Sequence, residues 1–183
     1  DSSRSNDQHG ALMMRTGDGL AIMQDFLSDL KSALMERPQA QERAAYAHFS
    51  TITTRWMDND IYGHVNNVTY YSYFDTAVNR YLIEAGVLDI HKGEVIGLVI
   101  ETHCNYFASL EFPKNVDAGI RVAHIGKSSV RYEIGLFDEG EPMSAAVGHF
   151  VHVYVDRDTR RPVQLPEPFV KALQALQVKP KAD

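Results

Sequence analysis

The sequence predicts an α+β domain built on an antiparallel sheet, and three observations support this prediction. A strand-like segment is followed by a long helical segment, and four more strand-like segments come after the helix. This order differs from the alternation of strands and helices that builds parallel sheets. A chain of 183 residues, 44% of them apolar, is also long enough for one globular domain and short for two.

The predicted elements follow from residue periodicity. Residues 46–56 are rich in β-branched and aromatic residues with rough alternation, which favours a strand. Apolar residues then recur at three- and four-residue steps from Asn67 to Ala85, and Gly86 is a helix stop signal. The turn-like sequences FPKN, IGKSS and DEGEP help to separate four further predicted strands, at residues 95–108, 116–126, 128–138 and 143–155. The segment EPFVKALQALQ predicts a short terminal helix.

Three segments flank the predicted domain of residues 46–176. Residues 1–17 are polar and are expected to be a disordered lead-in. Residues 18–45 are predicted to be an N-terminal helical extension, because apolar residues recur there at helical steps. Its apolar stripe either covers an edge of the core or contacts another chain. Residues 177–183 are expected to be a polar tail.

Composition excludes several classes of protein. The net charge is −6 and no cluster of lysine and arginine is longer than a pair, which argues against binding a nucleic acid backbone. No apolar run approaches the roughly 18 residues that span a bilayer, so we expect a soluble protein. Cys104 is the only cysteine, so no intrachain disulfide can form and a cytoplasmic location is expected.

The sequence RWMDNDIYGHVNN, residues 55–67, gathers chemically active side chains where the first strand ends and the long helix begins. A helix N-terminus offers free N–H groups and partial positive charge, which stabilise an oxyanion. A carboxylate such as Asp60 across from it suits acyl transfer to water. The alternative is purely structural: Asp58 and Asp60 form a turn, His64 packs or faces solvent, and Asn66 caps the helix.

A resemblance to a known family bears on this choice. The segment TRWMDNDIYGHVNNVTYYSYFDTAVNRYLIEAG, residues 54–86, resembles the signature region of the 4-hydroxybenzoyl-CoA thioesterase-like family of hot-dog-fold acyl-CoA thioesterases. The segments IGKSSVRYEIGLFD and FVHVYVDRDTRRPVQLP are similar to later parts of the family, so the likeness spans about residues 46–170. It implies a hot-dog fold, in which a curved antiparallel sheet of about five strands wraps one long central helix. The extra N-terminal helix lies outside the family pattern.

The resemblance also implies an activity and a site. The activity is hydrolysis of an acyl-CoA thioester to a free acid and CoA, with no cofactor and no metal. By family position Asp60 is the nucleophile or general base, and the backbone N–H of Asn67 stabilises the oxyanion. The remaining positions implied to line or support the pocket are Tyr62, Gly63, His64 and Asp75. Asp58 is expected to be structural.

The implied partners are acyl-CoA and further copies of the chain. Lys127, Ser128 and Arg131 are the implied CoA-binding residues, because the CoA phosphates need hydrogen-bond donors; an ordinary solvated turn is the alternative. Edge-strand pairing implies a homodimer or homotetramer, and neither nucleic acid nor membrane is an expected partner. Two other functions stay open, a thioesterase acting on acyl-carrier protein and a non-catalytic hot-dog module that binds an acyl group.

The sequence gives weaker support to a serine nucleophile, a cysteine nucleophile or a metal site. A serine hydrolase is disfavoured because the chain has no Gly-x-Ser-x-Gly sequence. His103 and Cys104 are adjacent on a predicted strand and therefore point to opposite faces, which disfavours a cysteine nucleophile. His149 and His152 are three residues apart on a predicted strand, so they do not form a shared metal site.

Overall fold

The computed structural model describes residues 23–24, 27–28 and 37–178. The chain divides into two units, Asp1–Pro38 and Gln39–Asp183, and the sheet with its helices belongs to the second unit. The predicted lead-in and most of the predicted polar tail lie outside the described residues. Of the predicted N-terminal helical extension, residues 23–24, 27–28 and 37–45 are described, and residues 37–45 hold the short 3-10 turn Arg43–Ala45 and no α-helix.

The described part of the second unit has the predicted order of elements. Its strands are β1 (His48–Thr53), β2 (Val95–Tyr106), β3 (Asn115–Ile125), β4 (Ser129–Asp138) and β5 (Ala146–Asp156). Its helices are α2 (Asn67–Glu84) and α3 (Glu167–Gln174), with short 3-10 turns η1 (Arg43–Ala45) and η2 (Trp56–Asp58). The α+β prediction is confirmed. Among the described residues, no helix has the length and apolar character needed to cross a membrane.

The first strand is shorter than predicted. β1 ends at Thr53, and the chain turns into η2 at Trp56. The side chain of Asp58 stabilises this turn by accepting a hydrogen bond from the backbone N–H of Arg55 at 2.8 Å. A side chain that bonds the backbone three residues back competes with strand pairing, which explains why the strand pattern does not continue to residue 56.

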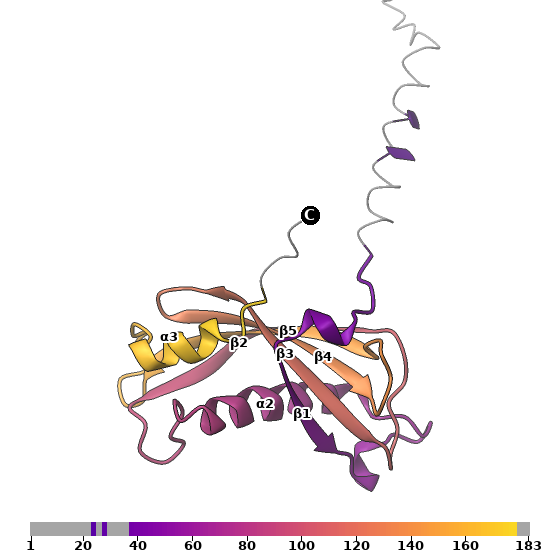
Figure 1. The fold of residues 1–183 in the computed structure, drawn as a ribbon, viewed down its shortest axis with the longest axis horizontal. Helices are drawn as coiled ribbons and strands as arrows, with labels where there is room; N and C mark the ends of the chain where they lie inside the picture. The colour runs from indigo at the N-terminus through magenta and orange to yellow at the C-terminus, as the bar shows by residue number, and fades with distance from the viewer. Residues whose placement is uncertain (1–22, 25–26, 29–36, 179–183) are drawn as a thin grey trace, which may run out of the picture. The chain divides into compact units, whose positions relative to one another are not determined.

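The strands form one antiparallel sheet in the order β1-β3-β4-β5-β2. Figure 1 shows the sheet with α2 lying along one of its faces. β1 and β2 are the edge strands, and β2 is the longer of the two with twelve residues. One side of β2 pairs with β5, so its other side carries backbone groups that no strand in this sheet pairs.

The contact between α2 and the sheet makes the core of the domain. Phe74 and Ala77 on α2 are fully buried, and the Phe74 ring lies 5.8 Å from the Phe150 ring on β5. The Phe74 ring also fills the space that a Cβ atom at Gly148 would need, so a glycine is required where this ring packs against β5. A long helix packed inside a five-stranded curved sheet is the hot-dog fold that the resemblance implied.

Candidate active site

The loop between η2 and α2 holds Asp60 by backbone hydrogen bonds. The Asp60 N–H donates to the His64 carbonyl at 2.8 Å, and the Gly63 N–H donates back to the Asp60 carbonyl at 3.1 Å. Gly63 has a φ of +83°, a conformation that other residues adopt at a cost. Asn59 and Val65 pair across the base of the loop. The loop is therefore a small closed turn with Asp60 on it.

The Asp60 carboxylate is half-buried and only partly engaged. One of its oxygens, Oδ1, accepts the Tyr62 N–H at 2.8 Å. Within the described residues, Oδ2 accepts no hydrogen bond and no cation forms an ion pair with the group. One carboxylate oxygen therefore remains available to a water molecule or a substrate.

The start of α2 offers one free backbone donor. The Asn66 side chain caps the helix by accepting the Val68 N–H at 3.2 Å, and the Asn66 carbonyl accepts the Thr69 N–H at 2.8 Å. The Asn67 N–H has no acceptor among the residues that the structure describes. Because the first N–H groups of a helix carry its positive dipole end, this donor suits an oxygen that gains negative charge.

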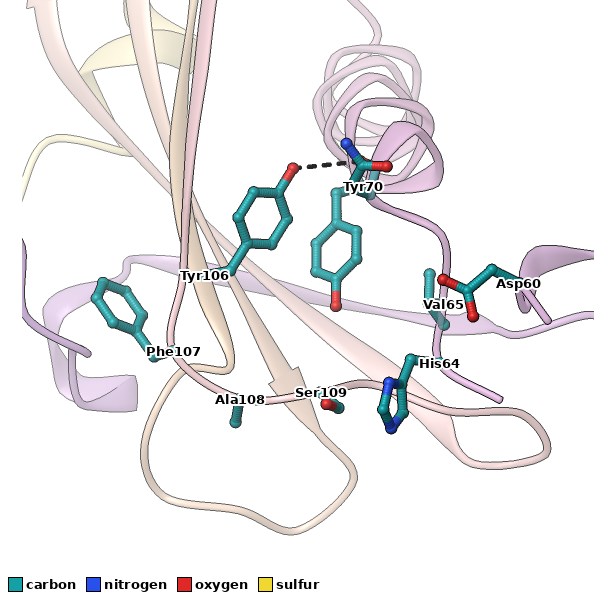
Figure 2. Close-up of a pocket in the computed structure, with 9 residues that line it drawn as sticks. Asp60, His64, Val65, Tyr70, Tyr106, Phe107, Ala108 and Ser109 are labelled. Atoms are coloured by element: carbon teal, nitrogen blue, oxygen red, sulfur yellow. Dashed lines mark hydrogen bonds between the residues drawn. The ribbon is translucent and has the colours of Figure 1, made fainter. Parts of the chain in front are cut away.

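Asp60 and Asn67 line the same pocket, which has a volume of about 370 Å³. Figure 2 shows the Asp60 carboxylate directed toward Val65 and the ring of Tyr70. The pocket is completed by His64, Val65, Tyr70, Tyr106, Phe107, Ala108 and Ser109. The site thus brings together a carboxylate, a free helix N–H and a wall of aromatic and small residues.

Two tyrosines build the wall between α2 and β2. The rings of Tyr70 and Tyr106 meet edge to face at 4.9 Å, and the Tyr106 hydroxyl donates to the Asn67 carbonyl at 3.3 Å. Burial raises the pKa of both hydroxyls above the ordinary tyrosine value. Both groups therefore stay protonated at neutral pH and act as hydrogen-bond donors.

Asp58 lies two residues from Asp60 in a different environment. It is buried, and its carboxylate accepts bonds from the Arg55 guanidinium at 2.8 and 3.0 Å and from the Tyr73 hydroxyl at 2.8 Å. Burial pushes the pKa of this carboxyl up, but the hydrogen bonds from Arg55 and Tyr73 outweigh burial and hold that pKa below its usual value. The Asp58 carbonyl also accepts the Asn66 N–H at 2.8 Å, which ties η2 to the start of α2.

The predicted supporting residues are spread around the loop and helix. His64 lines the pocket with Asp60, whereas Gly63 shapes the turn behind it. The Tyr62 side chain is 78% exposed and contributes its backbone N–H to Asp60. Asp75 is exposed on α2, where it accepts a bond from the Asn79 side chain at 3.0 Å, and it does not line this pocket.

The predicted CoA-binding residues lie away from this pocket within one chain. Lys127 and Ser128 are in the turn between β3 and β4, whereas the pocket lies beyond the opposite end of β4, roughly 30 Å along the strand. Arg131 pairs with Val151, the neighbour of Phe150, and the Phe150 ring packs against α2. Because adjacent strand residues face opposite sides, Arg131 points to the face of the sheet away from α2. Its guanidinium lies 3.7 Å from Glu101 and 3.8 Å from Glu133.

The histidines and the cysteine of β2 and β5 separate onto the two faces of the sheet. The His103 ring stacks on His149 at 5.6 Å, whereas Cys104 pairs with Gly148 on the face toward α2. Burial raises the pKa of the Cys104 thiol to about 11. His152 is buried on the opposite face from His149. In the described ranges, no three His, Cys, Asp or Glu side chains gather where they could hold a metal ion.

Sequence reasoning missed part of the pocket wall. Tyr106 and Ser109 come from the end of β2 and the segment after it, nearly 50 residues beyond Asp60 in the chain. The Val65 N–H donates to the Leu110 carbonyl at 2.8 Å, and this long-range bond ties the segment to the start of α2. The available signal was that polar and small residues follow the end of the second predicted strand.

A carboxylate in the same pocket as a free helix N–H suits the chemistry of thioester hydrolases, a class that uses the hot-dog fold. The comparisons agree with this class. The model of the thioesterase-like superfamily matches residues 54–173, so the chain belongs to that superfamily. The predicted family and the prediction of a thioester hydrolase are confirmed at this level.

Individual relatives support the same placement. The crystal structure of the PA5185 protein from Pseudomonas aeruginosa strain PAO1 is 57% identical, with 76% of this chain and 97% of that chain covered and a TM-score of 0.75. A thioesterase of Thermus thermophilus, crystallised with coenzyme A and zinc, is 30% identical over 74% of this chain and 97% of its own, with a TM-score of 0.61. The protein YsmA of Bacillus subtilis strain 168 is 24% identical over 72% of this chain and 88% of its own.

Proposed function

We propose that the protein is an acyl-CoA thioesterase in which Asp60 attacks the thioester or activates water, and the Asn67 N–H stabilises the oxyanion. The observation that carries this proposal is the shared pocket, where a carboxylate with one unengaged oxygen lies together with the free N–H of a helix start. The complex of the Thermus thermophilus thioesterase with coenzyme A supports CoA as the thiol partner.

Both roles for Asp60 lead to the same products. As a general base, Asp60 takes a proton from water, the hydroxide attacks the thioester carbon, and the carbon–sulfur bond breaks. The sulfur leaves as a thiolate and takes up a proton, so acyl-CoA and water become a free acid and CoA. As a nucleophile, Asp60 itself bonds to the carbon and expels the thiolate, and water then cleaves the acyl-aspartate anhydride. In both routes the Asn67 N–H faces the negatively charged oxygen of the intermediate.

A second copy of the chain completes the site in this proposal. The free edge of β2 carries exposed apolar residues, among them Val99 at 46% and Ile100 at 64% exposure. Pairing of two β2 edges would cover these residues and satisfy the unpaired backbone groups. Two antiparallel β2 strands related by a two-fold axis place the Val95 end of one beside the Tyr106 end of the other.

This arrangement explains the distant CoA-binding residues. Val95 pairs with Asp156 and Ser129 pairs with Val153, so the turn with Lys127 and Ser128 lies at the Val95 end of the sheet. Across the two-fold axis, that turn of the second copy comes to the end of the sheet where Asp60 lies. In this proposal the second copy supplies the cationic and hydroxyl groups that bind the CoA phosphates.

The state of the single cysteine supports the expected location. Cys104 on β2 is a free thiol and is half-buried. Unpaired thiols persist in reducing compartments. We therefore keep the cytoplasm as the proposed location.

A hydrolysis assay with thiol detection tests the function. Purified protein is incubated with short-chain, long-chain and aromatic acyl-CoAs, and with the matching acyl-carrier-protein thioesters. Release of free CoA from at least one acyl-CoA is the expected result. Binding of acyl-CoA without any thiol release would favour the non-catalytic module, and cleavage of carrier-protein thioesters alone would favour the carrier-protein enzyme.

A further inference from the structure

Asp60 lies between two pockets. Besides the pocket that it shares with Asn67, it lines a second one of about 320 Å³ together with Trp56, Asn59, Ile61 and Gly63. The acyl group and the thiol arm leave the carbon of a thioester in different directions. If that carbon is at Asp60, as the proposed function requires, each of the two groups can occupy one of the two pockets.

The second pocket has a larger apolar share in its lining than the first, and Trp56 and Ile61 supply its apolar side chains. Trp56 and Ile61 are 81% and 92% exposed. Among the aromatic rings of the described residues, only Phe112 contacts the Trp56 ring, edge on with 5.9 Å between the ring centroids. Asn59 is polar, but its amide donates to the Gly63 carbonyl at 3.0 Å and its oxygen accepts the Phe112 N–H at 3.2 Å. This pocket therefore offers apolar surface and few partners for a polar ligand.

The first pocket has the opposite character. His64 and Ser109 line it, and the Tyr70 hydroxyl points toward the side where these two residues lie (Figure 2). The arm that links the sulfur of CoA to its phosphates contains two amide groups, which need hydrogen-bond partners when they leave water. The first pocket offers His64, Ser109 and the Tyr70 hydroxyl as such partners, whereas the side chains of the second pocket offer fewer.

We propose that the pocket of Trp56 and Ile61 binds the acyl group and that these two residues select apolar acyl chains. The thiol arm then occupies the pocket of His64 and Ser109, and the thioester carbon lies at Asp60 between them. An apolar chain covers indole and isoleucine surface that is otherwise exposed to water, which favours binding of longer chains. An acetyl group is too short to make these contacts.

Selectivity among acyl-CoAs tests the proposal. Trp56→Ala and Ile61→Ala are each expected to lower kcat/KM for octanoyl-CoA by about tenfold or more, the scale set by lost apolar contacts, and to lower kcat/KM for acetyl-CoA much less. Met57→Ala is the matched control, because Met57 is an apolar residue of the same turn, 76% exposed, that lines neither pocket. It should change neither value.

A binding measurement tests the acyl pocket without requiring turnover of the substrate. Trp56 is the only tryptophan of the chain, so its fluorescence reports this pocket alone. A non-cleavable octanoyl thioether of CoA should shift the emission to shorter wavelength, because it removes the indole from water. The acetyl thioether and CoA itself should leave the emission unchanged.

The outcomes separate the two proposals. A wild-type protein that cleaves no acyl-CoA overturns the proposed function. Hydrolysis with equal losses for both substrates in Trp56→Ala, or with no loss in either, overturns the acyl pocket alone. An unchanged emission with the octanoyl thioether bound would also contradict it. Dissociation of an oligomer by Trp56→Ala, seen by light scattering, would assign these residues to a subunit contact instead.

Discussion

Asp58 and Asp60 are two residues apart, but their different surroundings suit the two carboxylates to different roles. Asp58 is buried and every bond it accepts is internal, from Arg55 and Tyr73. Asp60 accepts a single bond from the Tyr62 N–H and keeps an oxygen free on the pocket side. A carboxylate that is already satisfied cannot take a proton from water readily, whereas one with a free oxygen can.

His152 makes the stability of the protein depend on pH. It is buried among the aromatic rings of Tyr132, Phe150 and Tyr154, and its Nε2 atom has no hydrogen-bond partner among the residues that the structure describes. Burial lowers the pKa of its imidazole to about 4. Between that pH and the usual value near 6.5, the unfolded chain binds a proton that the folded chain does not, so the free energy of unfolding falls as the pH falls through this window.

The free energy of unfolding is expected to fall by about 3 kcal/mol between pH 7 and pH 4, because each unit of difference between the folded and unfolded pKa corresponds to about 1.36 kcal/mol. His152→Phe keeps an aromatic ring at this site and removes the titration. Urea unfolding at several pH values should show a shallower pH dependence for the variant than for the wild type. Two parallel curves would mean that His152 is not responsible.

Cys104 is expected to be dispensable for hydrolysis. Burial raises the pKa of its thiol to about 11, so the nucleophilic thiolate is scarce at neutral pH. Cys104→Ala should retain most of the activity, and iodoacetamide should modify the native enzyme slowly. Loss of most of the activity in a folded Cys104→Ala variant would support a cysteine nucleophile.

At the scale of elements, the site is the junction of η2 and α2, and Asp58 holds this junction together. Its side chain binds Arg55, directly before η2, and Tyr73 on α2, and its carbonyl accepts the Asn66 N–H at the helix start. Along the chain, Asp60 and Asn67 both lie between Asp58 and Tyr73, the two residues that this hydrogen bond joins. The relative position of the two groups therefore depends on this buried carboxylate.

Tyr73→Phe measures the strength of this junction. The variant removes one hydrogen bond to a buried carboxylate, which typically stabilises a protein by about 1.5–3 kcal/mol. The free energy of unfolding in urea should fall by this order. Tyr62→Phe is the control, because the Tyr62 side chain is 78% exposed, and it should leave stability unchanged. Equal stability of the two variants would contradict a role for Tyr73 in holding the junction.

The order of elements could be predicted because it depends on local periodicity. The helical spacing from Asn67 and the stop at Gly86, which has a φ of +71°, predicted α2 almost to the residue. The placement of Asp60 at the loop before this helix followed from the same pattern. The face separation of His149 and His152 was also predictable, since it needs only the alternation of a strand.

Long-range pairing could not be predicted from the sequence. The strand order places β2 at an edge and brings Tyr106 to the start of α2, although nothing near Tyr106 in the chain indicates this. The burial of Asp58 depends on Tyr73, fifteen residues away on the next helix. The pocket of Trp56 and Ile61 lies at a turn in which the Asn59 amide donates to the Gly63 carbonyl, a contact that no composition rule indicates.

At the scale of the whole molecule, the free edge of β2 predicts a dimer. Light scattering at micromolar concentration should show no species with the mass of one chain. Ile100→Lys places a charge on the exposed edge and should produce monomers. Ile90→Lys is the matched control, since Ile90 is 56% exposed in a loop outside the strands, and should stay dimeric. A wild-type monomer that hydrolyses acyl-CoA would contradict the shared site.

The kcat of Asp60→Asn tests the central claim most directly, because this substitution keeps the shape of the side chain and removes its charge. We expect kcat to fall by a factor of about 10² or more with little change in substrate binding, the scale of losing a positioned base or nucleophile. Asp58→Asn, measured where it is folded, should reduce kcat far less. If both folded variants hydrolyse acyl-CoA at nearly the wild-type rate, Asp60 is not the catalytic carboxylate.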